Sequence, residues 1–170
     1  NSINLIIENK ESLMLNGHDI ANFIKLTEDA KFIKKCIENR NTLGIEKSDI
    51  VTLICETKDP DYIIKCIEKR KELGIDSRFI SMLIKETNDS KYIKECIENK
   101  EELGIVYITD LIIATNDSEY IKECIENRKS LGLDKTDAIK LIEATKDQDY
   151  IKKCIENIDK LDIPLYRIYS

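Results

Sequence analysis

The sequence repeats itself about every 30 residues, and this period limits the possible folds more than any other feature. Five cysteines mark it: Cys36, Cys66, Cys96, Cys124 and Cys154. Leu-Gly-Ile or Leu-Gly-Leu follows each of the first four, and a Thr-x-Asp triplet recurs in the same register. The one shorter step reflects two residues missing after Ile105. An internal repeat of this length is typical of proteins built from stacked helical pairs.

Each repeat is predicted to form a long and a short helix. In the third repeat, Asp59 is expected to cap the long helix and Pro60 to begin it, since Pro tolerates the first helical position. Its apolar residues share one face at 100° per residue: Tyr62, Ile63, Cys66, Ile67 and Leu73. The helix should span about 14 residues, 60–73, and end at Gly74 with positive φ. A shorter helix capped by Asp76 or Ser77 should follow and end near Thr87.

One helical pair cannot bury its own apolar face, so neighbouring pairs must stack. The predicted fold is all-α: a right-handed α-solenoid of about five to six helix-turn-helix repeats of ~30 residues, forming a single repeat domain over 1–170. The expected units are 1–28, 29–58, 59–88, 89–116, 117–146 and 147–170. The first is in register but has Ile6 in the cysteine place. The tail, 162–170, is expected to lie over the last repeat or to be cut from a longer protein.

Two known repeat families resemble this pattern. The short helix from Asp49, the long helix from Asp61 and the exit Leu73-Gly74-Ile75-Asp76 resemble a degenerate ankyrin repeat, without its Thr-Pro-Leu-His opening or its β-hairpin. The Leu-Gly-Ile break also resembles repeats of mitochondrial transcription-termination factors, which bind nucleic acid, although their proline is missing. The ankyrin resemblance implies a helical-pair scaffold for binding.

Composition argues against several classes of partner. The net charge is −6, which disfavours nucleic acid and anionic membranes. No run of about 18 apolar residues predicts a membrane-spanning helix. The first residues do not resemble a signal peptide and lack an initiator Met, so we expect a processed product or an excised fragment.

The repeated cysteines are interpreted as small buried hydrophobes. Stacked helices lie about 8–10 Å apart, too far for a disulfide. No Cys-x-x-Cys spacing suggests a metal site, and no cofactor is expected. Unpaired thiols indicate the cytoplasm or another reducing intracellular compartment. Cys55 differs, because it falls on the outer face of a short helix, where a reactive thiol is the alternative interpretation.

No catalytic site is predicted. His18, the sole histidine, follows Gly17 and is expected to be a solvated turn residue. Lysines at 34, 94, 122 and 152 precede glutamates by four residues, which predicts surface ion pairs within one helix. A ladder repeated in every unit is not the unique cluster that catalysis needs.

A basic column occupies one position near the end of the long helices: Lys10, Arg40, Arg70, Lys100 and Arg128. Ile158 holds this place in the last repeat. We favour side chains that cap C-terminal carbonyl groups. The alternative is a stripe that binds the phosphates of a nucleic acid.

The short helices vary most between repeats. We define their two outer columns as the short-helix face: Asn22, Thr52, Met82, Asp110 and Lys140, with Lys25, Cys55, Lys85, Ile113 and Glu143. Met82, Cys55 and Ile113 are apolar where a solvated surface would be polar, although relaxed surface could also vary freely. The favoured function is a non-enzymatic scaffold that binds a protein or peptide on this face. The alternatives are a nucleic-acid binder or a non-catalytic arm of a larger enzyme.

Overall fold

The computed structural model describes residues 2–157, and their regular structure is helical, without a strand. The all-α class predicted from the sequence is therefore confirmed for this part of the chain. Within it, no helix is long and apolar enough to cross a membrane. The tail, 162–170, and Ile158 lie outside the described residues.

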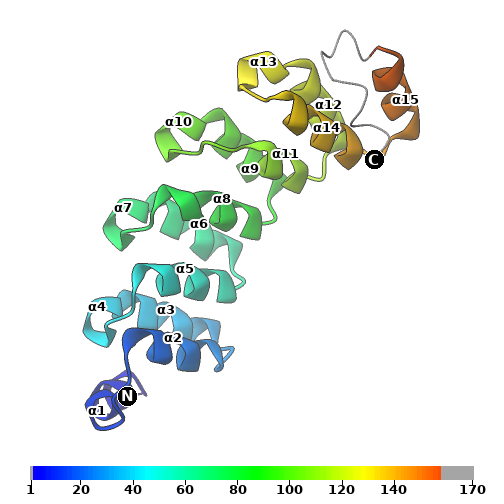
Figure 1. Cartoon of the computed structure of the whole chain (residues 1–170). Coiled ribbons are helices and arrows are strands. Elements are labelled where there is room, and N and C mark those ends of the chain that lie inside the picture. Colours follow the sequence, from blue (N-terminus) through cyan, green and yellow to red (C-terminus); the bar gives the residue numbers. More distant parts are fainter. Residues whose placement is uncertain (1, 158–170) are drawn as a thin grey trace. The chain divides into compact units, whose positions relative to one another are not determined.

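The chain divides into two compact units, and their helices are labelled in Figure 1. The first comprises Asn1–Asp89 with Leu103–Ile105, and the second comprises Ser90–Glu102 with Val106–Ser170. The helices of the first are α1 (Ser2–Ser12), α2 (Gly17–Lys25), α3 (Ala30–Glu38), α4 (Arg40–Leu43), α5 (Lys47–Glu56), α6 (Pro60–Glu68), α7 (Arg70–Leu73) and α8 (Ser77–Glu86). The second holds α9 (Ser90–Glu98), α11 (Thr109–Ala114), α12 (Ser118–Glu126), α13 (Arg128–Leu131), α14 (Lys135–Ala144) and α15 (Gln148–Glu156), and α10 (Lys100–Leu103) crosses the division.

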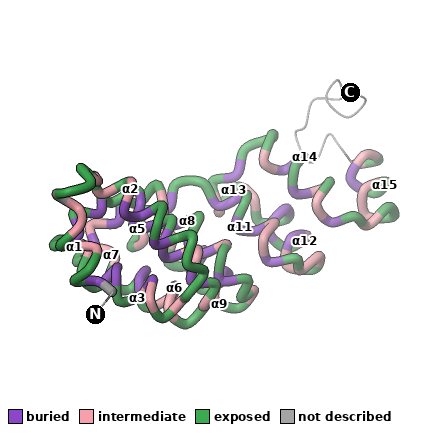
Figure 2. The backbone as a smooth tube through the Cα atoms, turned by 90° about the horizontal axis from the view of Figure 1, so that it is seen from below, coloured by how far each residue is buried: buried purple, intermediate pink, exposed green. Residues whose placement is uncertain are grey.

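Within each unit, helices of one repeat pack on each other and on the next repeat. In the first unit, α3 packs along α5, α6 along α8, and α5 lies between α2 and α8. In the second, α9 packs on α11, α12 on α14, and α11 lies beside α14. Buried residues alternate with exposed ones along these helices (Figure 2), and isoleucines such as Ile33, Ile63 and Ile121 are almost fully buried. The apolar stripes of the sequence are thus the faces by which the helices pack.

The predicted start and stop signals are present. The Asp59 carboxylate accepts a hydrogen bond from the Tyr62 N–H at 3.1 Å, and Pro60 begins α6. Gly74 ends α7 with φ +67°, a left-handed conformation that glycine adopts without steric cost. Asp76, rather than Ser77, caps α8, and its side chain accepts from the Arg78 N–H. Thr87 is the C-terminal cap of that helix.

The predicted long helix, 60–73, is wrong in one respect. It breaks at Lys69, where φ is −88° and ψ is +15°, so α6 and α7 are separate helices. Side chains satisfy the carbonyl groups at such breaks. Arg70 donates to the Ile67 carbonyl at 3.4 Å, and the Asn39 amide in the second repeat donates to the Lys35 carbonyl at 2.8 Å. Satisfied carbonyls remove the main cost of interrupting a helix.

The Thr-x-Asp turns share one backbone form. The Thr57 hydroxyl donates to the Ile54 carbonyl at 2.6 Å, so the threonine braces its turn. The middle residue lies in the left-handed region in every copy, at Glu28, Lys58, Asn88, Asn116 and Lys146, with φ between +49° and +54°. Asparagine adopts this conformation readily, but lysine and glutamate do so at a steric cost.

Candidate functional site

In the first unit, the short-helix face is carried by α2, α5 and α8. Asn22, Thr52 and Met82 are exposed, while Cys55 and Lys85 are half-buried. The Lys25 ammonium lies 2.9 Å from a carboxylate oxygen of Glu56, which links α2 to α5 across this face. The structure therefore brings the predicted residues of neighbouring short helices onto one surface within this unit.

In the second unit, α11 and α14 carry the remaining members of the face. Asp110, Lys140 and Glu143 are exposed, and Ile113 is half-buried. All ten predicted positions thus escape full burial. Ile113 and Cys55 are the less accessible members, so Met82, at 37% exposure, is the main apolar group that reaches solvent.

Cys55 is poorly suited to be a reactive thiol. Partial burial and, to a smaller extent, the nearby carboxylates of Glu86 and Glu56 together raise its pKa to about 11, because both disfavour the negatively charged thiolate. Because the thiolate is the nucleophile, the thiol is largely unreactive near neutral pH. Its physical role on the face is that of a small apolar contact.

The basic column caps carbonyl groups, as the favoured interpretation predicted. Arg40, Arg70 and Arg128 each donate to a carbonyl of the preceding helix at 3.4 Å. Arg40 also donates to the Glu72 carbonyl of the next repeat at 3.2 Å, and Lys100 donates to the Leu131 carbonyl at 2.8 Å. Lys10, the first member, is half-buried and lies near Gly44. The column therefore joins neighbouring repeats at the side where the Leu-Gly-Ile turns lie, which we call the glycine edge.

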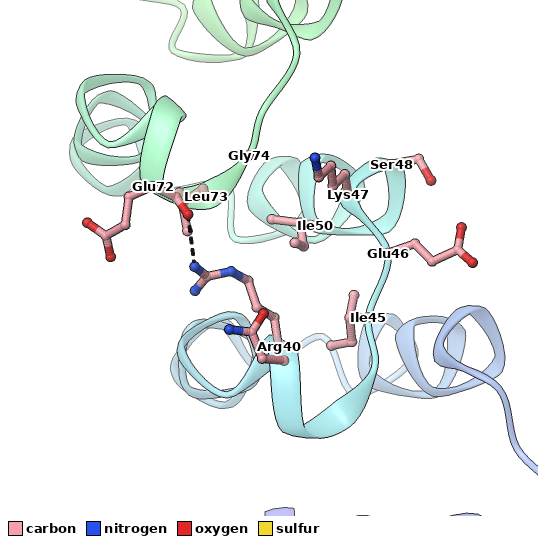
Figure 3. Close-up of a pocket in the computed structure, with 10 residues that line it drawn as sticks. Arg40, Ile45, Glu46, Lys47, Ser48, Ile50, Glu72, Leu73 and Gly74 are labelled. Carbon is pink, nitrogen blue, oxygen red and sulfur yellow. Dashed lines mark hydrogen bonds between the residues drawn. The ribbon is translucent and has the colours of Figure 1, made fainter.

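An open hollow of about 690 Å³ lies at the glycine edge of the second and third repeats (Figure 3). Arg40 points across it to the Glu72 carbonyl, and Glu46, Lys47 and Ser48 contribute from the start of α5. Its lining contains neither His nor Cys. A second type of hollow recurs between consecutive long helices, α3 with α6 and α9 with α12. Recurrence indicates a property of the repeat rather than an active site.

The opposite side of each repeat, which we call the aspartate edge, carries a three-residue contact that the sequence did not reveal. The predicted pairing with the glutamate four residues later is wrong for Lys94 and Lys122, whose ammonium groups reach Asp117 at 2.7 Å and Asp147 at 2.8 Å in the next repeat. Lys34 likewise pairs with Asp59. Lys122 also pairs with Glu119 of its own helix at 2.8 Å. Each aspartate is already held in place by capping its helix, so it offers a fixed carboxylate to the incoming lysine.

A tyrosine completes each contact. The ammonium groups of Lys34, Lys94 and Lys122 lie 4.8, 4.6 and 5.3 Å from the ring centroids of Tyr62, Tyr120 and Tyr150. This distance suits a cation–π interaction. The equivalent position in the third repeat is Ile64, which cannot make an ionic contact. The lysine contact thus occurs within both units as a structural device.

His18 is exposed to solvent, as predicted, with 64% of its side chain accessible, but it belongs to a helix rather than to a turn. It lies in the first turn of α2, and its Nδ1 is 2.9 Å from Oδ1 of the nearly buried Asp49 on α5. The hydrogen bond and charge of Asp49 raise the pKa of the imidazole. The sequence did not indicate this contact, because Asp49 is one repeat later in the chain and comes close to His18 only when α2 and α5 pack together. The same place in the second unit holds Asp137, which accepts from the Thr109 hydroxyl at 2.7 Å.

The repeated cysteines are buried as predicted, with Cys36 fully inaccessible. Burial raises the pKa of the Cys36 thiol to about 11 and also raises that of the other four. Among residues 2–157, no three His, Cys, Asp or Glu side chains gather as a metal site would require.

Two sets of residues were missed. The Lys–Asp–Tyr contacts had a signal, because Lys34, Lys94 and Lys122 share one register with an aspartate near the start of the next repeat. Glu56 and Glu86 lie beside Cys55. Nothing in the sequence signalled this proximity beyond their positions in the short helices.

Comparisons of the chain with protein-family models, with curated proteins and with solved structures find no match.

Proposed function

We propose that this chain is a non-catalytic α-solenoid that binds a protein or peptide segment along its short-helix face. The observation that supports this proposal is the contrast within the repeat. The apolar stripe, the aspartate cap and the Gly turn barely change between repeats, whereas the short-helix face changes at every step. Within each unit, stacked short helices would present these differing side chains as an extended surface, as in other helical-repeat binders.

The face has the chemistry of a specific interface of modest size. Met82 supplies an exposed apolar group, and Cys55 and Ile113 lie half-buried beside polar positions. Lys25 and Glu56 pair with each other at 2.9 Å, so part of its charge is already neutralised before a partner arrives. An extended peptide in which apolar side chains alternate with polar ones would match this pattern.

The test starts from a peptide-display selection against residues 1–170, followed by calorimetric titration of the selected peptide. Replacing Met82, Cys55 and Ile113 together with Glu should weaken binding at least tenfold, because charges would replace the apolar contacts. Helicity, measured by circular dichroism, should be retained.

The matched control places three new glutamates elsewhere, by Asn41→Glu, Thr42→Glu and Ser130→Glu. These exposed residues lie on α4 and α13. The control should bind the peptide like the parent chain. If both triple variants weaken peptide binding equally, the effect is due to net charge alone and the proposal is wrong.

Two alternatives have their own tests. A nucleic-acid binder using the basic column should lose affinity steeply with salt and on changing Arg40, Arg70 and Arg128 to Gln. The carbonyl contacts of these residues are observations in favour of a structural role instead. A non-catalytic arm of a larger enzyme predicts a catalytic domain in the full reading frame.

The proposed location is the cytoplasm or another reducing compartment. The supporting observation is that the described cysteines are unpaired and five of them are buried. Burial and a raised thiol pKa suit a protein whose cysteines serve as apolar packing.

A further inference from the structure

The two hollows between consecutive long helices occupy the same place in the repeat but differ in charge. The hollow between α3 and α6, in the first unit, has a volume of about 480 Å³, and that between α9 and α12, in the second, has about 340 Å³. The first is lined by Lys34, Arg40, Lys65 and Lys69, together with Glu38 and Glu72. The second is lined by Lys100, together with Glu98 and Glu123. The repeat therefore explains the hollow, but it does not explain the excess of cations around the first one.

Lys69 departs from the repeat at the break between α6 and α7. The other repeats have asparagine at this position: Asn9, Asn39, Asn99, Asn127 and Asn157. All of these amides except that of Asn127 donate to the carbonyl four residues earlier, at distances between 2.7 and 2.9 Å. The Lys69 side chain is exposed and has no hydrogen bond or ion pair within residues 2–157. The third repeat thus replaces a local helix cap with a free cation, and a local rule broken without structural gain is typical of functional positions.

Lys65 adds a second free cation on the same side of α6. It lies four residues before Lys69, and like charges at this spacing destabilise a helix. The corresponding pairs in other repeats hold at most one cation: Lys35 with Asn39, Glu95 with Asn99, Glu123 with Asn127, and Lys153 with Asn157. Within residues 2–157, neither Lys65 nor Arg40 forms an ion pair, although Glu38 and Glu72 line the same hollow. Arg40 donates only to carbonyl groups, which are neutral. Three cations beside one hollow therefore lack a counter-ion in the described part of the chain.

The same hollow has an apolar surface. Ile37, Cys66 and Leu73 line it and are 1%, 4% and 9% exposed, so they belong to the core, and Tyr62 lines it as a half-buried residue. A ligand that matches this surface carries negative groups next to an apolar side chain, as an acidic peptide does.

The cations do not continue along the chain as a nucleic acid would require. In the column of Lys35 and Lys65, the next two repeats have Glu95 and Glu123. A nucleic-acid backbone needs cations spaced along its phosphates. A short acidic segment needs them at one place only.

We propose that the hollow between α3 and α6 binds an acidic peptide segment whose carboxylates pair with Arg40, Lys65 and Lys69. An apolar side chain of this segment packs against the buried residues of the hollow. The site is separate from the short-helix face, which α2, α5 and α8 carry in this unit, and it adds a second binding surface to the chain.

The test is fluorescence anisotropy with residues 1–170 and a short labelled peptide of alternating glutamate and leucine. The same peptide with glutamine in place of glutamate should bind roughly tenfold or more weakly, and salt should weaken binding of the glutamate peptide. Lys65→Glu with Lys69→Asn gives this hollow the residue types of its counterpart, Glu123 and Asn127, so the variant should fold normally. It should bind the glutamate peptide roughly tenfold or more weakly than the parent chain.

Lys31→Glu with Lys58→Asn is the matched control. It changes the net charge by the same amount at two exposed residues that do not line the hollow. Glu119 and Asn88 hold these positions in other repeats, so the fold tolerates both residue types. The control should bind the peptide like the parent chain.

Three results would overturn the proposal. The first is a parent chain that does not prefer the glutamate peptide to the glutamine peptide at low salt. The second is equal weakening by the two double variants, which would reduce the effect to net charge. The third is an oligothymidylate that displaces the peptide and no longer binds to the Lys65→Glu/Lys69→Asn variant, which would assign the hollow to nucleic acid.

Discussion

The two edges of the repeat hold neighbouring repeats together by different chemistry. At the aspartate edge, the contact is between side chains: a lysine ammonium, a capping carboxylate and a tyrosine ring, as in Lys94, Asp117 and Tyr120. At the glycine edge, the acceptors are backbone carbonyls, such as that of Glu72, which receives a hydrogen bond from Arg40. One edge therefore depends on which side chains are present, and the other depends on how closely the backbone turns approach.

This difference determines how each edge should tolerate change. Side-chain ion pairs at the surface contribute little individually and vary in strength with salt. Close backbone approach leaves no room for added atoms, so it should be sensitive to the smallest substitution. Substitutions of matched size on each edge can test that contrast.

Gly17→Ala should have the largest effect. Gly17 begins α2, and a methyl group there would lie 1.8 Å from the Gly44 carbonyl oxygen and 2.7 Å from its carbon, both backbone atoms. Relief requires α2 and the next turn to separate, so we expect a loss of about 3 kcal/mol in the free energy of unfolding, the upper range for overpacking. Urea denaturation followed by circular dichroism measures it.

Gly132→Ala is the control for this substitution. Gly132 has φ +74°, but no atom lies within 4 Å of an added methyl group. It should cost only the left-handed strain, about 1–2 kcal/mol. If the two alanine variants lose equal stability, close approach is not what holds the glycine edge.

At the aspartate edge, the capping role of Asp117 should outweigh its ion pair. The carboxylate accepts from the N–H groups of Glu119 and Tyr120, both at 3.1 Å, and also pairs with Lys94. Asp117→Ala removes both and should cost about 1–2 kcal/mol, as lost caps do. Asp117→Asn keeps a capping oxygen but removes the charge, so it should cost about 0.5 kcal/mol, similar to Lys94→Met.

Thermal and urea unfolding measure the stability of these three single variants and of the Asp117→Asn/Lys94→Met double variant. Together they separate the contribution of the cap from that of the ion pair. The double variant should lose little more than either single one, because the ion pair is then already absent. A cost for Asp117→Asn as large as that for Asp117→Ala would mean that the ion pair, and not the cap, dominates this edge.

The turn that carries the aspartate edge is itself strained in some repeats. Lys58 has φ +49°, whereas Asn88 holds the same place one repeat later. Lys58→Asn should raise the free energy of unfolding by up to about 1 kcal/mol, because asparagine tolerates the left-handed region. The reverse change, Asn88→Lys, should lower it by a similar amount in the same urea assay. The two substitutions must change the free energy of unfolding in opposite directions. If both lower it, the effect comes from contacts of the side chains and not from backbone strain.

Local features could be read from the sequence, and contacts across repeats could not. The Asp59 cap, Pro60 and the Gly74 turn depend on neighbours a few residues away, so residue type and spacing predicted them correctly. The break at Lys69 was missed, because it depends on Arg70 capping a carbonyl that an unbroken helix would leave bonded. The partners of Lys34 and His18 lie about one repeat away in the sequence. Several aspartates occur in that range, so the sequence alone did not identify the partner.

The candidate sites divide in the same way. The exposure of Met82 followed from helical periodicity. The exposure of Leu5, Leu13 and Phe23 in the first repeat did not, because the sequence predicts the same paired helices there as in other repeats. It arises from where α1 packs, which depends on tertiary contacts. The binding role of the short-helix face remains a prediction, since residue variation alone names no partner.

The aspartate edge and the His18–Asp49 contact should also respond to pH in opposite directions. Hydrogen bonds from Lys34, Lys94 and Lys122 lower the pKa of Asp59, Asp117 and Asp147 below the usual 3.8. Their contribution is present above that value and is lost as the pH falls through the lowered pKa. At the start of the short helices, the hydrogen bond to Asp49 raises the pKa of His18 above 6.5. That contribution is present below pH 6.5 and is lost as the pH rises through the raised pKa.

His18→Gln isolates the second effect, since glutamine can donate to Asp49 but does not titrate. The stability of the parent chain relative to this variant should be constant below about pH 6 and should decrease toward pH 8, measured by urea midpoints. Because His18 is the only histidine, its imidazole proton signals in an NMR titration belong to one residue and report its pKa directly. A value at or below 6.5 would contradict the contact with Asp49. A raised value with no difference between the urea profiles would show that the contact forms without linking α2 to α5.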